Sequence, residues 1–135
     1  MKQQQPAMEI LDRAECLRLM CRAPFGRLVY TVAAMPSVQP VNFIVHQDMI
    51  VIRTASESKL AAATRGSVVA FETDDIDVET HTGWSVMVVG RCYEVTELFE
   101  LAELAAAAPR AWACPDGQRF IAVRIEQVTG RWLHP

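Results

Sequence analysis

Residues 83–95 read GWSVMVVGRCYEV, and this long apolar run shapes every expectation about the fold. A segment so rich in Val, with Trp and Met beside it, predicts a β-strand that needs cover on both faces. One small domain supplies too little cover for both faces, which would leave an exposed apolar patch. We therefore expect a homodimer in which a second copy covers part of the strand.

Further strands are expected on both sides of this run. Val, Ile and other strand-forming residues mark five more segments, and the last of them also alternates between two faces. These are RLVYTVA from residue 27, VQPVNFIVH from 38, MIVIRT from 49, SVVAFETD from 67 and QRFIAVRIEQVTGRWL from 118. The expected breaks are at 35–37, at Gln47 and Asp48, and at an acidic turn of Asp74, Asp75, Asp77 and Glu79. Six strands with short helices predict a mainly β fold that closes into a small antiparallel barrel.

Three helices accompany these strands. Apolar residues at helical spacing predict an amphipathic helix over residues 7–20. Ser56 is placed to cap a short helix that ends at Gly66, and Thr96 is placed to cap a helix over 97–108.

Composition and charge argue against several classes of function. A chain of 135 residues that is 51% hydrophobic suits one domain over residues 1–135. Its net charge of -3 offers no basic surface to a polyanion, so no nucleic-acid partner is expected. No apolar run approaches the roughly 20 residues that span a bilayer, and the first residues lack the apolar core of a signal peptide. We expect a cytoplasmic protein without a membrane partner.

The cysteines and the acidic turn do not predict a metal site. Cys16, Cys21, Cys92 and Cys114 form no CxxC pair and no zinc-like spacing with His, so free buried thiols are expected. The acidic stretch ETDDIDVET lacks the Gly and final Glu spacing of an EF-hand loop, which favours a solvated connection without a metal.

A candidate anion site lies where the strand MIVIRT passes into the short helix. Its polar groups follow one another closely: Arg53, Thr54, Ser56, Ser58 and Lys59. Lys59 faces the positive end of the helix dipole, which is unfavourable unless an anion compensates. Because the loop lacks the glycines that wrap a triphosphate, one terminal phosphate monoester suits it better. In the alternative interpretation the serine only caps the helix, the arginine pairs with an acid such as Asp74, and the lysine is solvated.

A second candidate region is the segment HTGWS at the start of the long strand. Trp84 follows Gly83 and has Ser85 beside it, so its ring could face a flat heteroaromatic ligand. Alternatively, Trp84 is a core or interface aromatic. His81 has no nucleophile or carboxylate at a fixed spacing, and we interpret it as a polar loop residue.

The ordered set FGRLVY, PVNF, IVIRT…SKL, VAFETDDID, TGWSVMVVG and TGRWL closely resembles the pyridoxamine 5′-phosphate oxidase-like family of FMN-binding split barrels. The resemblance covers nearly the whole chain, from about residue 15 to residue 133. It implies a six-stranded split barrel that forms a homodimer with FMN at the subunit interface.

The resemblance also implies roles for individual residues. In the family, a strand ending in Thr and a following Ser-Lys or Arg-Lys pair hold the FMN phosphate, which here points to Thr54, Ser58 and Lys59, with Arg53 alongside. The segment of Pro40, Val41, Asn42 and Phe43 would lie along the flavin. Trp84 and Ser85 match a strand start that approaches the cofactor from the partner subunit.

This resemblance leaves the reaction open. The chain ends at GRWLHP, without the C-terminal Arg and His residues that grip the substrate in true pyridoxamine 5′-phosphate oxidases, so vitamin B6 oxidation is not expected. We expect an FMN-dependent oxidoreductase acting on a small substrate. The alternatives are a flavin carrier or sensor without turnover, or a split barrel that uses F420 or haem.

Overall fold

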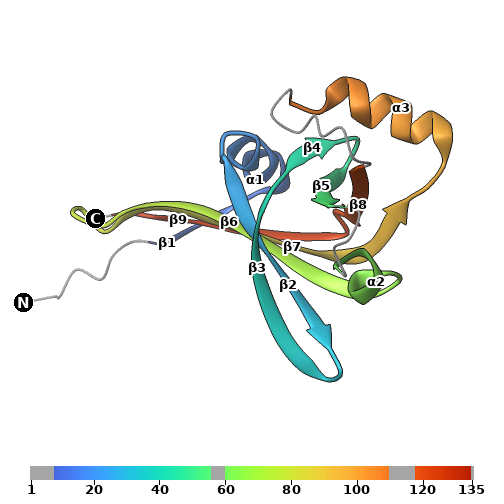
Figure 1. The fold of residues 1–135 in the computed structure, drawn as a ribbon. Coiled ribbons are helices and arrows are strands. Elements are labelled where there is room, and N and C mark those ends of the chain that lie inside the picture. Colours follow the sequence, from blue (N-terminus) through green and yellow to red (C-terminus); the bar gives the residue numbers. More distant parts are fainter. Residues whose placement is uncertain (1–7, 56–59, 110–117, 135) are drawn as a thin grey trace, which may run out of the picture.

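The computed structural model describes residues 8–55, 60–109 and 118–134, which form a mainly β fold with short helices (Figure 1). The strands are β1 (Met8–Leu11), β2 (Phe25–Val32), β3 (Met35–Asn42), β4 (Ile44–His46), β5 (Met49–Ala55), β6 (Val68–Asp77), β7 (Thr82–Val95), β8 (Gln118–Arg124) and β9 (Gln127–Leu133). The helices are α1 (Arg13–Met20), α2 (Leu60–Thr64) and α3 (Leu98–Ala107).

All the strands join one antiparallel sheet. Strand β7 connects the part that contains β6 and β9 with the part that contains β8 and β5. The order is β3-β2-β6-β7-β8-β5-β4, with β9 on β7 and β1 on β9. Along one edge, β7 pairs with β9 through Val89 and with β8 from Cys92 onward. Gly90 lies between them, where a Cβ would collide with the carbonyl oxygen of Arg124. The first half of β7 therefore projects with β6, β9 and β1 as an arm, visible in Figure 1.

The two faces of this sheet differ in burial. Alternate residues of β6 and β7 are buried against α1 and the main core, on what we call the inner face: Val69, Phe71, Thr73, Trp84, Val86 and Val88. The residues between them lie on the outer face: Val68, Ala70, Glu72, Asp74, Ile76, Ser85, Met87 and Val89. A second core cluster includes Leu104 of α3 and Phe120 of β8. The single chain thus covers the inner face and leaves the outer one open.

The described residues form nine strands where six were expected, because three predicted segments are divided differently. The predicted strand 38–46 breaks at Phe43 into β3 and β4, and the predicted strand 118–133 breaks after Arg124 into β8 and β9. Residues 8–11 were predicted to begin a helix, but they pair with β9 as β1. Hydrogen bonds to the open edge of β9 outweigh the helical spacing of these residues.

Of the two caps predicted from the sequence, only Thr96 can be compared with the structure, and it is displaced by one residue. α1 begins at Arg13, and the Asp12 carboxylate accepts a hydrogen bond from the backbone N–H of Glu15 at 2.8 Å. The cap of α3 is Glu97, one residue after the predicted threonine. Ser56, the predicted cap of the short helix, lies outside the described residues.

The turns were predicted with mixed success. The link at Gln47 and Asp48 is confirmed between β4 and β5. The β2–β3 hairpin turns at Ala33 and Ala34 instead of 35–37, and both alanines adopt positive φ angles, 49° and 65°. The acidic residues from Asp74 to Asp77 extend β6 and do not form a turn, because they pair with β7.

Two thiols are buried as expected, and one is not. Cys16 and Cys92 are free and buried, and burial raises the pKa of both thiols. Cys21 is free but exposed, and Cys114 lies outside the described residues. No helix within the described segments combines the length and the apolar character needed to cross a membrane.

Candidate functional site

The residues expected along a flavin lie at the end of β3 and directly after it, and their side chains alternate in burial. Val41 and Phe43 are buried, and the Phe43 ring meets the Phe71 ring edge-on with centroids 4.6 Å apart. Pro40 and Asn42 are exposed and pair with Arg27 and Phe25 of β2. Because side chains alternate along a strand, Pro40 and Asn42 point to the outer face while their neighbours anchor the backbone in the core.

The expected phosphate corner is described only in part. Arg53 and Thr54 lie near the end of β5, opposite Phe120 and Arg119 of β8. Thr54 is buried, and its hydroxyl donates to the carbonyl of Arg119 at 3.5 Å. Ser58 and Lys59 lie outside the described residues, so their predicted contacts with a phosphate remain predictions.

The residues after this corner are firmly packed. Leu60 and Ala61 of α2 are buried, and the Thr64 hydroxyl donates to the Leu60 carbonyl at 2.8 Å. The backbone N–H of Gly66 donates to the Cys92 carbonyl at 2.8 Å, which ties α2 to the middle of the sheet. A helix packed against the core therefore follows the candidate anion site.

Trp84 and Ser85 are neighbours that point to opposite faces of β7. The Trp84 side chain is buried in the main core, between Asp75 of β6 and Trp132 of β9 in the cross-strand row. Ser85 lies on the outer face in the same row as Asp74 and Arg131. Within one chain, Trp84 thus fits the alternative of a core aromatic, and Ser85 shares a face with Pro40 and Asn42.

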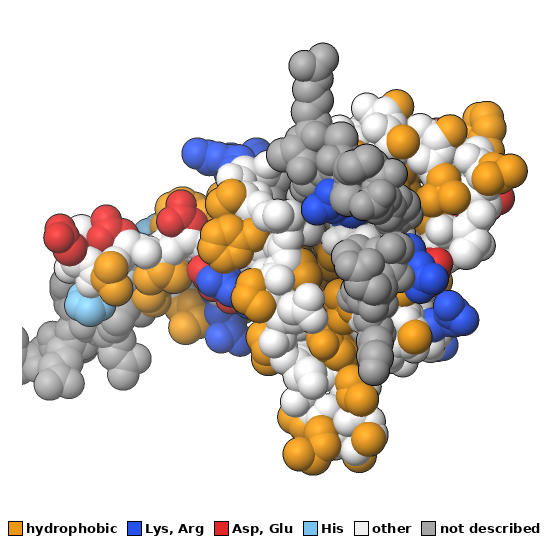
Figure 2. All heavy atoms as spheres, viewed as in Figure 1, with side chains coloured by type: hydrophobic (Ala, Val, Ile, Leu, Met, Phe, Trp, Pro, Cys, Tyr) orange, Lys and Arg blue, Asp and Glu red, His pale blue; other side chains and the backbone are white. Residues whose placement is uncertain are grey.

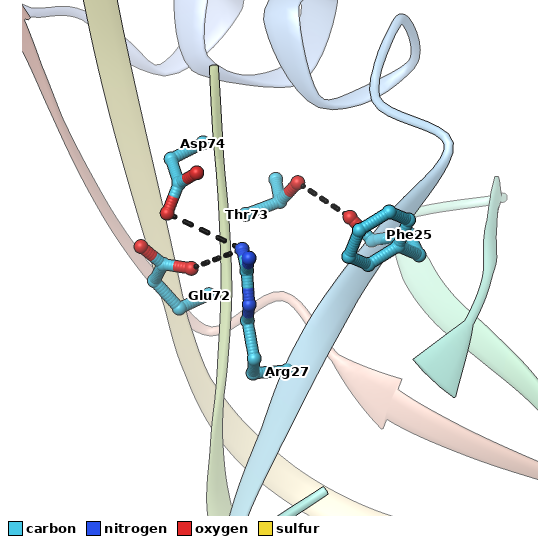
Figure 3. A network of polar contacts seen from close by, with 5 residues as sticks. All are labelled: Phe25, Arg27, Glu72, Thr73 and Asp74. Atoms are coloured by element: carbon cyan, nitrogen blue, oxygen red, sulfur yellow. Dashed lines mark hydrogen bonds and ion pairs between the residues drawn. The ribbon is translucent and has the colours of Figure 1, made fainter. Parts of the chain in front are cut away.

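A cluster of charged side chains lies on the outer face between β2 and β6 (Figure 3). Arg27 Nη1 lies 3.2 Å from Glu72 Oε1 and 3.3 Å from Asp74 Oδ2. The guanidinium also stands over the Phe25 ring, 5.4 Å from its centroid. Asp74, suggested from the sequence as a partner for Arg53, is therefore held by a different arginine.

The position of this cluster raises the pKa of Glu72. Burial of the carboxyl group is the largest cause, and the hydrogen bond and negative charge of Asp74 act in the same direction. Arg27 opposes them, and the resulting pKa is about 7. The Glu72 carboxyl group can therefore hold a proton near neutral pH.

An open cleft of about 760 Å³ adjoins this cluster at the base of the arm. It is lined by Leu19, Arg22, Ala23, Pro24, Phe25, Arg27, Asp74, Asp75, Ile76, Asp77, Thr82, Gly83, Trp84 and Trp132. Figure 2 shows the acidic side chains along the arm and hydrophobic side chains at the tip of the β2–β3 hairpin. The sequence did not predict the cleft, although FGRLVY, VAFETDDID, TGWSVMVVG and TGRWL each contribute residues to it.

Comparisons with known proteins agree with this fold. The profile of the family described as pyridoxamine 5′-phosphate oxidase matches residues 12–132. The uncharacterized protein Rv0080 of Mycobacterium tuberculosis is 37% identical over 133 residues, which span 93% of this chain and 87% of that protein. A Mycobacterium smegmatis structure, described as an FAD-binding protein, is 35% identical with a TM-score of 0.78, covering 93% of this chain and 98% of that one.

A further structure, from Corynebacterium glutamicum and named after the same oxidase, superposes with a TM-score of 0.82 at 28% identity. The superposition covers 96% of this chain and all of that one, 100%. The profile match, the M. tuberculosis relative and the shared fold agree over nearly the same residues. The chain therefore belongs to the pyridoxamine 5′-phosphate oxidase family.

Proposed function

We propose that the protein binds a flavin nucleotide on its outer face and acts as an oxidoreductase on a small substrate. The observation that supports this most directly is the common direction of Pro40, Asn42 and Ser85, all expected near a flavin and all on the outer face. The M. smegmatis relative, similar over 93% of this chain, is described as FAD-binding.

FMN is the flavin that the sequence favours, because the corner after β5 suits one terminal phosphate. The groups expected to hold it are Arg53, Thr54, Ser58 and Lys59. FAD is the second candidate, favoured by the description of the M. smegmatis relative. Both flavins carry a phosphate that riboflavin lacks, so riboflavin is the natural control.

We further propose that a second copy of the chain completes the site. The outer face carries large hydrophobic side chains that this chain leaves open, among them Ile10 at 86% exposure and Met87 at 43%. Val38 and Val68 extend the same apolar surface over β3 and β6. An isologous dimer would bury this face and enclose a flavin lying on it.

The chain's own part in catalysis would be binding and orientation. A bound flavin supplies the electron-transfer chemistry, so the protein needs no nucleophile of its own. Pro40 and Asn42 would position one side of the ring, the corner after β5 would hold the phosphate, and the second copy would exclude water.

Spectroscopic titration tests the binding proposal. FMN, FAD, F420, haem and riboflavin would each be added to the purified protein, and binding followed by absorption and by quenching of flavin fluorescence. We expect FMN or FAD to bind more tightly than riboflavin. Binding of F420 or haem alone would overturn the flavin proposal. Rapid reduction by NADH or NADPH, coupled to reoxidation by an acceptor, would support an oxidoreductase, whereas its absence would indicate a carrier.

The phosphate corner has its own prediction. Lys59→Glu should weaken FMN about ten-fold to a hundred-fold, because a charge-assisted hydrogen bond contributes about 1.5–3 kcal/mol. Riboflavin affinity should change little. An equal loss of riboflavin binding would mean that the fold is damaged, and unchanged FMN affinity would contradict phosphate binding at this corner. Arg53→Ala should act in the same direction.

A further inference from the structure

On the outer face, Arg27, Glu72 and Asp74 form a charged cluster with apolar side chains nearby. Arg27 of β2 stands directly opposite Glu72 of β6 in the strand register, and Asp74 follows two residues later on the same face. Their neighbours in the sequence, Leu28, Phe71 and Thr73, point inward and are fully buried. The alternation of both strands therefore fixes the charged groups on the outer face.

The charges in this cluster do not balance. Arg27 is the basic partner of both carboxylates in the ion pairs that the described residues form. On β7, the residues that face the cluster are Ser85 and Met87, which carry no charge. The next cation along the Asp74 row is Arg131 of β9, whose backbone lies two strand spacings away, about 9–10 Å. With both carboxyl groups ionised, the cluster has a net charge of -1 per chain.

Covering such a cluster has a predictable cost. Removing an unbalanced charge from water costs a large free energy. Removing a neutral, hydrogen-bonded set of groups from water costs much less. In an isologous dimer the same face meets itself, so each interface contains two such clusters. One proton bound between Glu72 and Asp74 neutralises each cluster while Arg27 stays paired.

We infer that the Arg27, Glu72 and Asp74 cluster is a proton-binding site of the subunit interface, and that two copies associate with uptake of one proton per chain. This inference rests on the homodimer proposed above. Each proton comes from solvent and stays on a carboxyl oxygen, so no other reactant is needed. The dimer should therefore be tightest under mildly acidic conditions.

The test is the dimer dissociation constant of the full chain, measured by analytical ultracentrifugation with saturating FMN at constant ionic strength. Between pH 6 and pH 8 the dissociation constant should rise at least about ten-fold, because protons bound on association make assembly pH-dependent. Dilution calorimetry at pH 8, above the pKa of about 7 that Glu72 has in the single chain, should show release of about one proton per chain when the dimer dissociates, in buffers of different ionisation enthalpy.

Variants identify the group involved. Glu72→Gln should keep the tight dissociation constant of low pH across the whole range, and Asp74→Asn should do the same because it removes the same surplus charge. Asp75→Asn is the matched control, since Asp75 alternates with Asp74 and lies on the other face. It should keep the wild-type pH dependence.

The outcomes separate this inference from the proposed function. A dimer whose dissociation constant does not vary with pH would overturn proton uptake but keep the homodimer, and would point to a partner cation such as Arg131 as the balancing charge. A monomer at every pH in saturating FMN would overturn the homodimer and this inference together. A pH dependence retained in Glu72→Gln and Asp74→Asn would overturn the assignment to this cluster.

Discussion

The two faces of β6 and β7 are made by the same strands and yet have different roles. On the inner face, Phe71, Val86 and Val88 are fully buried or nearly so. On the outer face, their neighbours Glu72 and Met87 remain accessible. One residue of shift along either strand changes a side chain from a core position to a position on the open surface.

The difference in burial separates residues that stabilise the fold from residues that are available for assembly and ligand binding. The inner face is covered by α1 and the remaining strands of the same chain, so its residues determine the free energy of unfolding. The outer face is left open by the described part of the chain, so its residues should determine the assembly and ligand binding proposed above. The following variants test this division, with the same substitution placed on neighbouring residues where the chain allows it.

Val86→Asn should have the largest effect. Its side chain is 1% exposed, and an amide there would lose water without gaining a partner. We expect the free energy of unfolding to fall by more than about 3 kcal/mol, measured by urea denaturation. A fall below about 1 kcal/mol would mean that the inner face tolerates polar groups and that the contrast between the faces is wrong.

Met87→Asn places the same substitution on the next residue. This side chain is 43% exposed, so the free energy of unfolding of the monomer should change by less than about 1 kcal/mol. The dimer dissociation constant should rise at least about ten-fold, as measured by sedimentation, because one buried apolar side chain contributes about 1.5–3 kcal/mol. Unchanged assembly would remove Met87 from the proposed interface.

Glu72→Gln should have the smallest effect, and it should depend on pH. Because the pKa of Glu72 is raised from 4.5 to about 7, the folded chain holds a proton that the unfolded chain has released between these values. Stability is therefore lost as the pH rises through this window. In the Met87→Asn background, Glu72→Gln should stabilise the fold by about 1 kcal/mol at pH 8, allowing for solvent screening, and by almost nothing at pH 4. Equal effects at both pH values would contradict the raised pKa.

Much of the fold was predictable because the composition and spacing of residues within single segments indicate its strands. Val69, Phe71, Val86 and Val88 lie in segments rich in Val and other apolar residues, and this composition identified β6 and β7. Residues 8–11 were misassigned because their helical spacing is local, whereas the β9 edge that holds them is more than 110 residues away in the sequence. The Ala33–Ala34 turn was missed because alanine gives no signal for a positive φ angle.

The candidate site was predictable only where it is continuous in the sequence. The segment of Pro40 to Phe43 was identified through family resemblance, but only the structure shows that two of its side chains face outward. Arg27 and Glu72 lie 45 positions apart, so no spacing pattern could reveal their pairing. Trp84 was ambiguous from the sequence because an aromatic residue beside a glycine suits a core as well as a ligand.

The shared edge of β7 has a consequence for synthesis of the protein in the cell. One end of that edge pairs with β8 and the other end pairs with β9. Strand β1 also pairs with β9. All of these partners come from residues 118–133, which leave the ribosome after every other described strand. Nascent chains that end before this segment would expose unpaired edges of β1, β5 and β7 together, and such edges attract other chains. Folding of this sheet should thus be completed only after translation of its last strand.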